Sequence, residues 1–456
     1  MPFFLDHQLK IFFSGIGGSG VSAIASFMAD KGHIVAGSDR SFDSNPAHPV
    51  YQILKSKNIA IVPQDGSGLD SSFDLAVFST AVEADQPEVI KAKRIGVPMQ
   101  TRPEFLAKIV TEFKTIAVAG TSGKSTTGGM LAFIMQRLGM RPNFIGGGRV
   151  KQFKTAHNAG NAITGESERL VMEACESDGT IINYKPEHSI ILNLDLDHHS
   201  VENTAEMFKI LGGNTSGMII LNSDDTHLGE VPLLNTVPFS IDSASGYRAE
   251  AVDLQPFSTG FSVNGTRFRL SIPGKYNLYN ALSCIALLGE MGISHENIAA
   301  ALTEFSGIER RFDIHLNDGK RLVIDDYAHN PHKLASFMRT MQNVREHVCY
   351  IFQPHGFAPT RMMKAEYIGA FAENLRRSDH LILLPIYYAG GTASKDISSS
   401  DLAAGIRERG KSVEVVEGRG IVLSRSGEWD SYAILGARDE TLSDFARDLA
   451  KNLTRP

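Results

Sequence analysis

The stretch Thr115-Ile-Ala-Val-Ala-Gly-Thr-Ser-Gly-Lys-Ser-Thr126 decides the fold of this 456-residue chain. An apolar run leads into glycines and then into a lysine followed by hydroxyl side chains, which predicts a buried strand that turns sharply into a helix. In such a turn, backbone N–H groups surround phosphates, Lys124 can reach the β and γ oxygens, and the Ser125 hydroxyl can bind Mg²⁺. The loop is shorter than the usual phosphate-binding loop, whose first glycine would fall on Val118. We expect ATP binding by Gly120, Thr121, Gly123, Lys124, Ser125 and Thr126.

Short apolar runs alternate with amphipathic segments on both sides of this stretch, which predicts parallel sheets covered by helices. We expect an α/β fold of three domains: a Rossmann-like N-terminal domain (1–112), a central P-loop α/β ATPase domain (113–308) and a C-terminal Rossmann-like α/β domain (309–456). Residues 245–272 alternate polar and apolar positions between turns and predict antiparallel β structure. The predicted strands are Lys10–Ser14, His33–Ala36, Leu75–Thr80, Thr115–Gly120, Leu170–Cys175, Ser189–Leu194, Met218–Asn222, Leu322–Asp326, Val348–Gln353, His380–Pro385 and Tyr432–Gly436.

Another glycine-rich turn lies earlier in the chain, directly after the first predicted strand. Its glycines permit a tight turn and close approach of the backbone to a diphosphate at a helix N-terminus. Asp39 lies about where a ribose-binding acid is expected. The same pattern fits an NAD(P)-dependent oxidoreductase, or glycines required only for packing, and this alternative stays open on the motif alone. The candidate residues of this turn are Gly15, Gly17, Gly18, Gly20 and Asp39.

Acidic and histidine side chains come directly after two predicted strands of the central domain. Parallel strands bring their C-terminal ends to the sheet edge where the phosphate loop lies, and carboxylate oxygens suit Mg²⁺. We expect Glu173 and His198 to bind metal, whereas Asp178 and Asp195 can equally be capping residues. The full set is Glu173, Glu176, Asp178, Asp195, Asp197, His198 and His199.

The overall composition excludes several classes of protein. A net charge of −6 argues against a general nucleic-acid or membrane surface. The three cysteines (Cys175, Cys284 and Cys349) form no CxxC pair, which fits a reducing compartment. No apolar stretch reaches membrane length. We therefore expect a cytoplasmic protein without nucleic-acid or membrane partners; nothing in the sequence indicates its oligomeric state.

In this order, the motifs resemble the Mur ligase family over essentially the full chain, and within it the branch that joins UDP-N-acetylmuramate to L-alanine. The resemblance implies domains for the UDP substrate, for ATP and for the amine. The matching segments are FFSGIGGSGVSAIA, VAGTSGKSTT, NFIGGG, MEACESDG, NLDLDHH, PGKYNLYNAL, GIERRFD, VIDDYAHNP and FQPHGFAPTR.

The resemblance also implies a role for individual residues. Lys124 would hold the ATP phosphates, Ser125 and Glu173 one Mg²⁺, and His198 a second. The other implied contacts are Asn277 and Asn280 near the base, Arg311 at the phosphates, Asp326 at the ribose, Tyr327 and His329 in the amine pocket, and the first-domain glycines at the UDP diphosphate. Arg310 would be a solvated neighbour of Arg311.

The activity implied is an ATP-dependent ligase that forms an amide through an acyl phosphate, in peptidoglycan synthesis. Its substrates would be UDP-N-acetylmuramate and an amino acid, L-alanine first. Gly356 and Pro359 stand where that branch has two arginines for the amino-acid carboxylate, and Cys175 stands where it has an acid. A different amino acid or a short recycled peptide therefore remains an alternative acceptor, and a Mur-like protein without activity is the other alternative.

Overall fold

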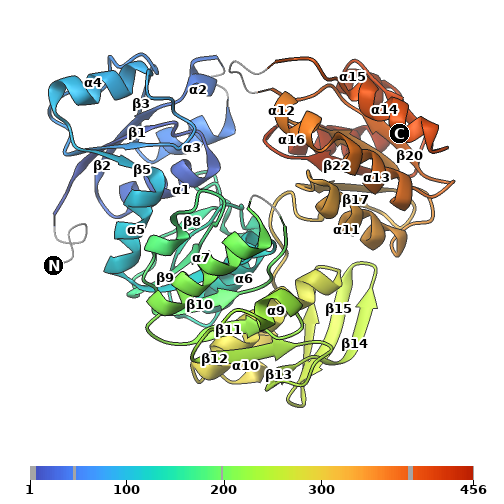
Figure 1. The fold of residues 1–456 in the computed structure, drawn as a ribbon, viewed down its shortest axis with the longest axis horizontal. Coiled ribbons are helices and arrows are strands. Elements are labelled where there is room, and N and C mark those ends of the chain that lie inside the picture. The colour runs from blue at the N-terminus through green and yellow to red at the C-terminus, as the bar shows by residue number, and fades with distance from the viewer. Residues whose placement is uncertain (1–6, 45–47, 197–198, 389–393, 455–456) are drawn as a thin grey trace. The chain divides into compact units, whose positions relative to one another are not determined.

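The computed structural model describes residues 7–44, 48–196, 199–388 and 394–454. The chain forms two compact units, Met1–Ile308 and Glu309–Pro456. Both are α/β, with mostly parallel sheets between helices (Figure 1). This is the fold class that the alternating apolar runs predict.

The first sheet belongs to the N-terminal part of the first unit. Its five parallel strands run in the order β3-β2-β1-β4-β5, so the strand order reverses at β1. Ligands of such sheets bind beside the C-terminal end of the strand at the reversal, where the first glycine-rich turn lies. The elements are β1 (Lys10–Ser14), α1 (Ser19–Asp30), β2 (Ile34–Ser38), α2 (Arg40–Ser44), α3 (Pro49–Ser56), β3 (Ala60–Val62), β4 (Leu75–Phe78), α4 (Pro87–Ile95), β5 (Met99–Thr101) and α5 (Arg102–Glu112).

The second sheet has eight strands in the order β13-β12-β11-β10-β6-β9-β7-β8, with β8 antiparallel to β7. Strand β6 lies between β10 and β9, so the order reverses at β6, and the lysine-bearing loop follows this strand. The strands are β6 (Lys114–Ala119), β7 (Asn143–Ile145), β8 (Ala162–Ile163), β9 (Arg169–Glu173), β10 (His188–Ile191), β11 (Ile219–Asn222), β12 (Thr236–Ser240) and β13 (Tyr247–Arg248).

The rest of the first unit comprises helices and one small sheet. Residues predicted as antiparallel form a three-stranded antiparallel sheet, β14 (Glu250–Gln255), β15 (Ser258–Val263) and β16 (Thr266–Leu270). Phe261 and Phe268 stack on adjacent strands of this sheet, with ring centroids 5.3 Å apart. The helices are α6 (Lys124–Arg137), η1 (Lys151–Phe153), η2 (Thr180–Asn183), α7 (Val201–Asn214), α8 (Thr226–Gly229), α9 (Lys275–Glu290) and α10 (His295–Thr303).

The second unit contains one six-stranded sheet in the order β17-β18-β22-β19-β20-β21. Strand β17 is antiparallel to β18 and the other pairs are parallel. The strands are β17 (Asp313–Asn317), β18 (Leu322–Asp326), β19 (Cys349–Gln353), β20 (His380–Leu383), β21 (Val413–Val415) and β22 (Ser431–Gly436). The helices are α11 (Pro331–Gln342), α12 (Phe357–Met362), α13 (Lys364–Asn374), α14 (Ser399–Glu408), α15 (Arg419–Ser424) and α16 (Leu442–Thr454).

Each unit has its own apolar core. In the first unit one cluster of buried side chains includes Phe13 of the first sheet and Ile191 of the second, so these two sheets share packing. In the second unit Ile351 and Ile434 pack against Phe445 of α16. Within the described ranges, no helix is long and apolar enough to cross a bilayer.

Candidate nucleotide and substrate sites

The loop between β6 and α6 has a backbone that glycine makes possible. Gly120 has φ +132° and Gly123 has φ +89°, a region that side chains rarely adopt. A Cβ atom at Gly123 would lie 2.5 Å from Oδ1 of Asn280, which belongs to α9. The loop therefore packs closely against α9, and α6 begins at Lys124 with free N–H groups at its first turn, where anions bind.

Lys124 folds back onto the loop that precedes it. Its ammonium Nζ donates to the Gly120 carbonyl at 2.6 Å and to Oε2 of Glu176 at 2.8 Å. Both side chains are buried. Burial by itself lowers the pKa of Lys124, but the charge of Glu176 and its neighbours outweighs burial and raises this pKa above the ordinary lysine value. The lysine is thus held charged inside the turn.

The metal-suited oxygens expected at the end of β9 are beside the loop. The Ser125 hydroxyl donates to Oε2 of Glu173 at 2.9 Å, and the backbone N–H of Gly147 donates to the same oxygen at 2.8 Å. Thr126 is buried in the first turn of α6. A hydroxyl and a carboxylate oxygen at this distance form part of a donor set that suits Mg²⁺.

His198 and Asp197 lie outside the described residues. Among the residues that are described, no group of three or more His, Cys, Asp or Glu side chains could hold a metal ion. The assignment of His198 to a second metal therefore stays a prediction.

Asn193, which the sequence analysis did not single out, holds the loop in place. Its Oδ1 accepts hydrogen bonds from the Thr121 hydroxyl and the Ser122 N–H, both at 2.8 Å, and its Nδ2 donates to the Ser122 carbonyl. The Asp195 N–H in turn donates to the Thr121 hydroxyl at 3.1 Å. The sequence predicts a strand over Ser189–Leu194 that includes Asn193, but β10 ends at Ile191, so Asn193 follows the strand and its side chain reaches the loop.

The two asparagines of α9 lie on one buried face of the helix. Nδ2 of Asn280 donates to Oδ1 of Asn277 at 3.3 Å, and Nδ2 of Asn277 donates to the Pro273 carbonyl at 2.7 Å. Because Asn280 also lies against Gly123, the structure brings this pair to the lysine loop, and their expected place near the nucleotide base stays a prediction.

The first glycine-rich turn follows β1 and precedes α1. Gly15 has φ +79°, and a Cβ at Gly17 would lie 2.8 Å from Oδ2 of Asp39. That oxygen accepts the Gly17 N–H at 2.8 Å. Gly18 is the N-cap of α1 and has no side-chain cap, so the helix presents free N–H groups there. Asp39 thus supports the turn, and its expected contact with a ribose remains a prediction.

An ion pair connects this turn with the segment after β9. Nη2 of Arg102, the first residue of α5, donates to Oδ2 of Asp178 at 2.7 Å. The same guanidinium lies beside Gly20, whose Cβ would be 3.5 Å from Cδ of Arg102. Oδ1 of Asp178 also accepts the Thr180 N–H, so Asp178 stabilises the turn before η2, whose N-cap is Gly179, in addition to forming the ion pair.

In the second unit, the expectation that Arg310 is solvated is wrong. Its side chain is 5% exposed and donates to both oxygens of Asp325 at 3.2 and 3.3 Å and to the carbonyls of Gly436 and Asp439. The sequence analysis missed this because the partners lie 15 to 129 residues further along the chain. Arg310 is a structural residue of the C-terminal sheet edge.

Arg311 and Asp326 lie at the same edge. The Arg311 guanidinium carbon lies 4.9 Å from the ring centroid of Tyr327. Asp326 accepts the backbone N–H groups of Phe312 and Ala328, each at 2.7 Å. Burial is the main effect on the Asp326 carboxyl and raises its pKa, against the influence of Arg311. The roles assigned to Arg311 and Asp326 at phosphates and ribose stay predictions.

Tyr327 and His329 come together with His355. The His329 ring is T-shaped to Tyr327 and to His355, with centroids 5.5 and 5.4 Å apart. Burial lowers the pKa of His329 to about 3 and that of His355 to about 4, so both imidazoles are neutral at pH 7. Nδ1 of His329 lies 2.8 Å from the Tyr327 carbonyl and donates to it when this nitrogen carries the proton.

Gly356 and Pro359 belong to the segment in which the related branch has two arginines. Gly356 has φ +70°, and a Cβ there would lie 3.2 Å from Cδ of Pro359. Arg361 donates to the Ser394 carbonyl and pairs with Asp396. Arg361 is therefore held by an acid and does not stand free to replace the missing guanidinium groups.

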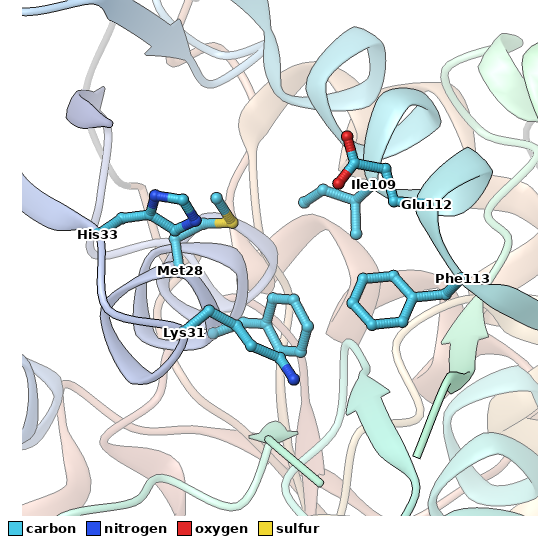
Figure 2. A pocket seen from close by; sticks show the side chains of 7 residues that line it. Met28, Lys31, His33, Ile109, Glu112 and Phe113 are labelled. Atoms are coloured by element: carbon cyan, nitrogen blue, oxygen red, sulfur yellow. The ribbon is translucent and has the colours of Figure 1, made fainter. Parts of the chain in front are cut away.

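A small pocket in the first unit is lined by none of the residues of these loops (Figure 2). It lies between the end of α1 and the end of α5, and Lys31 donates there to the Gly165 carbonyl at 3.2 Å. The Lys31 ammonium is 5.6 Å from the ring centroids of both Phe27 and Phe113. Burial lowers the pKa of Lys31. The pocket is lined largely by packing side chains and holds none of the candidate residues.

Known proteins resemble this chain over nearly its whole length. A UDP-N-acetylmuramate–L-alanine ligase of Caldicellulosiruptor saccharolyticus is 31% identical over 451 residues, which cover 94% of this chain and 96% of that protein. One of Carboxydothermus hydrogenoformans is 32% identical and covers 89% and 88%. The solved UDP-N-acetylmuramate–alanine ligase of Thermotoga maritima superposes with a TM-score of 0.81 at 25% identity and covers 97% and 99%.

Three family domains match in succession. The Mur ligase catalytic domain covers residues 10–114, the Mur ligase middle domain 118–288, and the Mur ligase glutamate ligase domain 310–429. A murein peptide ligase of Psychrobacter arcticus, at 21% identity and a TM-score of 0.72, shares the fold. Because these three models match most of the sequence, this chain belongs to the Mur ligase family.

Proposed function

We propose that this protein is an ATP-dependent ligase that joins the carboxylate of UDP-N-acetylmuramate to the amino group of L-alanine in peptidoglycan synthesis. The observation that carries the proposal is the full-length match to ligases of that name in several bacteria. The lysine loop, with Ser125 and Glu173 in contact beside it, supports the ATP part. The alternative of an NAD(P)-dependent oxidoreductase would leave the lysine-bearing loop without a role.

The reaction needs activation because a carboxylate is a poor electrophile. A carboxylate oxygen attacks the γ-phosphorus of ATP and ADP leaves, which gives an acyl phosphate. The amine nitrogen then attacks the carbonyl carbon, loses a proton, and phosphate leaves with the former carboxylate oxygen. The chain contributes positioning and charge: Lys124 and the α6 N-terminus offset the negative charge that the phosphates bring together.

The proposal includes Mg²⁺ held by Ser125 and Glu173. Their oxygens are 2.9 Å apart and are hard donors, which fits this ion. When bound, the ion would offset phosphate charge. His198 is the proposed further ligand, and Arg311 and Asp326 are the proposed contributions of the second unit. A cytoplasmic location belongs to the proposal because ATP is used there and the three cysteines are free.

A second acceptor class is favoured by one observation. Gly356 and Pro359 supply no charged donor, and Arg361 is paired with Asp396. Two guanidinium groups would bind the carboxylate of a free amino acid strongly. Without them, the protein selects less strongly for a free amino acid as the acceptor. Another amino acid or a short peptide is therefore the alternative acceptor.

The test is ATP-dependent phosphate release with UDP-N-acetylmuramate and a panel of amino acids and short peptides, with products identified by mass. We expect a product whose mass is that of the sugar nucleotide plus L-alanine less water. A coupled product with a peptide alone would replace L-alanine by the alternative. Phosphate release without any coupled product would contradict ligase activity.

The site assignment has its own test. Lys124→Ala and Glu173→Ala are each expected to lower product formation by a factor of ~10² or more, because each removes charge or a ligand at the phosphates. Glu168→Gln is the matched control, since Glu168 forms an exposed pair with Lys114. Turnover close to the control in either variant would remove the assignment.

A further inference from the structure

The residue that the proposed mechanism leaves without a role is Glu176, three residues beyond the metal-suited Glu173. It follows β9, and its side chain is 2% exposed. Its carboxylate lies 2.8 Å from Nζ of Lys124, which is 10% exposed. Among the described residues, this carboxylate accepts its hydrogen bond from Lys124. A buried ion pair thus stands inside the loop that would receive ATP.

The three donors of the Lys124 ammonium are used unequally. Two make short contacts, to the Gly120 carbonyl at 2.6 Å and to Glu176 at 2.8 Å, whereas the Thr121 carbonyl is at the limiting distance of 3.5 Å. The carbonyl contacts are to neutral acceptors of its own loop. A phosphate oxygen carries charge and makes a stronger hydrogen bond than a carbonyl does. The contacts that a nucleotide would displace are therefore those to Gly120 and Thr121.

The contact to Glu176 cannot be given up in the same way. If Lys124 left it, a carboxylate that is 2% exposed would remain charged and without its partner beside the phosphates. Removing one partner of a buried ion pair is strongly unfavourable because the other charge stays desolvated. Glu173 is engaged elsewhere: its Oε2 accepts from Ser125 and Gly147, and among the described residues no hydrogen bond connects it to Lys124.

We propose that Glu176 is a positioning residue that keeps hold of Lys124 while the lysine turns its remaining donors from the loop carbonyls to the ATP phosphates. The proposal rests on the proposed function, since it assumes that ATP binds this loop. Glu176 acts through Lys124 and touches neither substrate nor metal. Cys175 stands where the related branch has an acid, and Glu176 is the carboxylate that accepts from Lys124 among the described residues.

Nucleotide binding in a double-mutant cycle tests this directly. The dissociation constant of Mg·ATP is measured by equilibrium dialysis for the full chain, for Glu176→Gln, for Lys124→Met and for the double variant. We expect Glu176→Gln to weaken binding about tenfold when Lys124 is present, as for loss of a charged hydrogen bond, and not to weaken it when Lys124 is absent. Glu168→Gln, which breaks the exposed pair with Lys114, is the control and should bind as the unaltered chain does.

Two results of the cycle overturn the proposal. An equal loss with and without Lys124 means that Glu176 acts on the fold and not on the lysine. Tighter ATP binding in Glu176→Gln means that the carboxylate only repels the phosphates. Absence of Mg·ATP binding by the unaltered chain is a different outcome, because it removes the proposed function together with this role.

A second measurement needs no nucleotide and applies where Lys124→Met binds too little ATP to measure. The rate at which an acylating reagent modifies Lys124 is followed by mass spectrometry in the ligand-free chain. Loss of the carboxylate removes one of the two short contacts that hold the buried ammonium, so Lys124 should react faster in Glu176→Gln than in the unaltered chain. An unchanged rate relative to Glu168→Gln overturns the proposal.

Discussion

At the scale of single residues, Arg310 is a buried charged side chain that connects several segments of the second unit by hydrogen bonds. Four hydrogen bonds connect its guanidinium to Asp325, Gly436 and Asp439, and Asp325 is fully buried. Burial is the main effect on the Asp325 carboxyl and raises its pKa to about 7, even though the charge of Arg310 acts in the opposite direction. The guanidinium therefore stabilises the sheet edge from which Arg311 and Asp326 project.

Arg310→Met should be strongly destabilising because it leaves Asp325 buried without its charged partner. We expect the free energy of unfolding of the second unit to fall by ~3–5 kcal/mol. Urea unfolding followed by circular dichroism measures the change. The control is Arg447→Met, whose exposed pair with Asp444 should contribute less than ~1 kcal/mol. Equal losses in the two variants would show that the Arg310 network does not stabilise the unit.

Glu88 gives a prediction about pH. It is fully buried and accepts hydrogen bonds from the Ser14 and Ser38 hydroxyls at the ends of β1 and β2. Burial raises its pKa above the ordinary value of 4.5. A carboxyl whose folded pKa is raised contributes its full stability below 4.5 and loses it as the pH rises through the folded value.

The stability of the unaltered chain relative to Glu88→Gln should therefore decrease as the pH rises from 4.5 towards 8. Urea midpoints of both proteins at several pH values give this difference, and the comparison removes the effect of every other titrating group. A difference that is constant with pH, or that grows, would show that Glu88 is ionised in the folded chain at no cost.

At the scale of elements, the turn from β6 into α6 depends on Gly123. Alanine there would adopt φ near +89° and place Cβ 2.5 Å from Asn280. We expect Gly123→Ala to lower stability by at least ~1–2 kcal/mol and to weaken ATP binding, because the loop must move away from α9. Gly213→Ala is the control: it lies in α7 with nothing within 4 Å, and should raise stability by up to ~1 kcal/mol. Unchanged nucleotide binding in Gly123→Ala would contradict the loop assignment.

The elements themselves were largely predictable from the sequence. The bounds of β1 and β18 agree residue for residue with the apolar runs Lys10–Ser14 and Leu322–Asp326. Helix α1 begins at Ser19, directly after Gly18, which serves as its N-cap. Continuous apolar runs carry this information because a strand inside a helix-covered parallel sheet is buried on both faces, as β1 and β18 are.

Contacts between distant elements were not predictable in the same way. The pairing of Lys124 with Glu176 spans 52 residues, and Arg102 meets Asp178 across 76. No local pattern records which acid a lysine or an arginine will meet, so Glu176 was one metal-suited residue among several, and Asn193 was overlooked. The family motifs name the candidate residues of the site, and the folded chain shows which of the described ones are in contact.

At the scale of the whole molecule, two glycine-bearing turns follow the strands at which their sheets reverse order. Gly15 begins one turn after β1 and Gly120 begins the other after β6, and both belong to the first unit. A fold with two such turns can hold two phosphate-bearing substrates, one at each sheet edge. This arrangement is what a ligase requires when a sugar nucleotide must receive a phosphoryl group from ATP.

The most direct test of the acyl phosphate route follows the carboxylate oxygen. UDP-N-acetylmuramate labelled with ¹⁸O in both carboxylate oxygens is incubated with the protein, Mg·ATP and L-alanine, and the products are examined by mass spectrometry. The account predicts one ¹⁸O atom in the released inorganic phosphate and one in the new amide. Unlabelled phosphate, or ¹⁸O recovered in AMP, would contradict it.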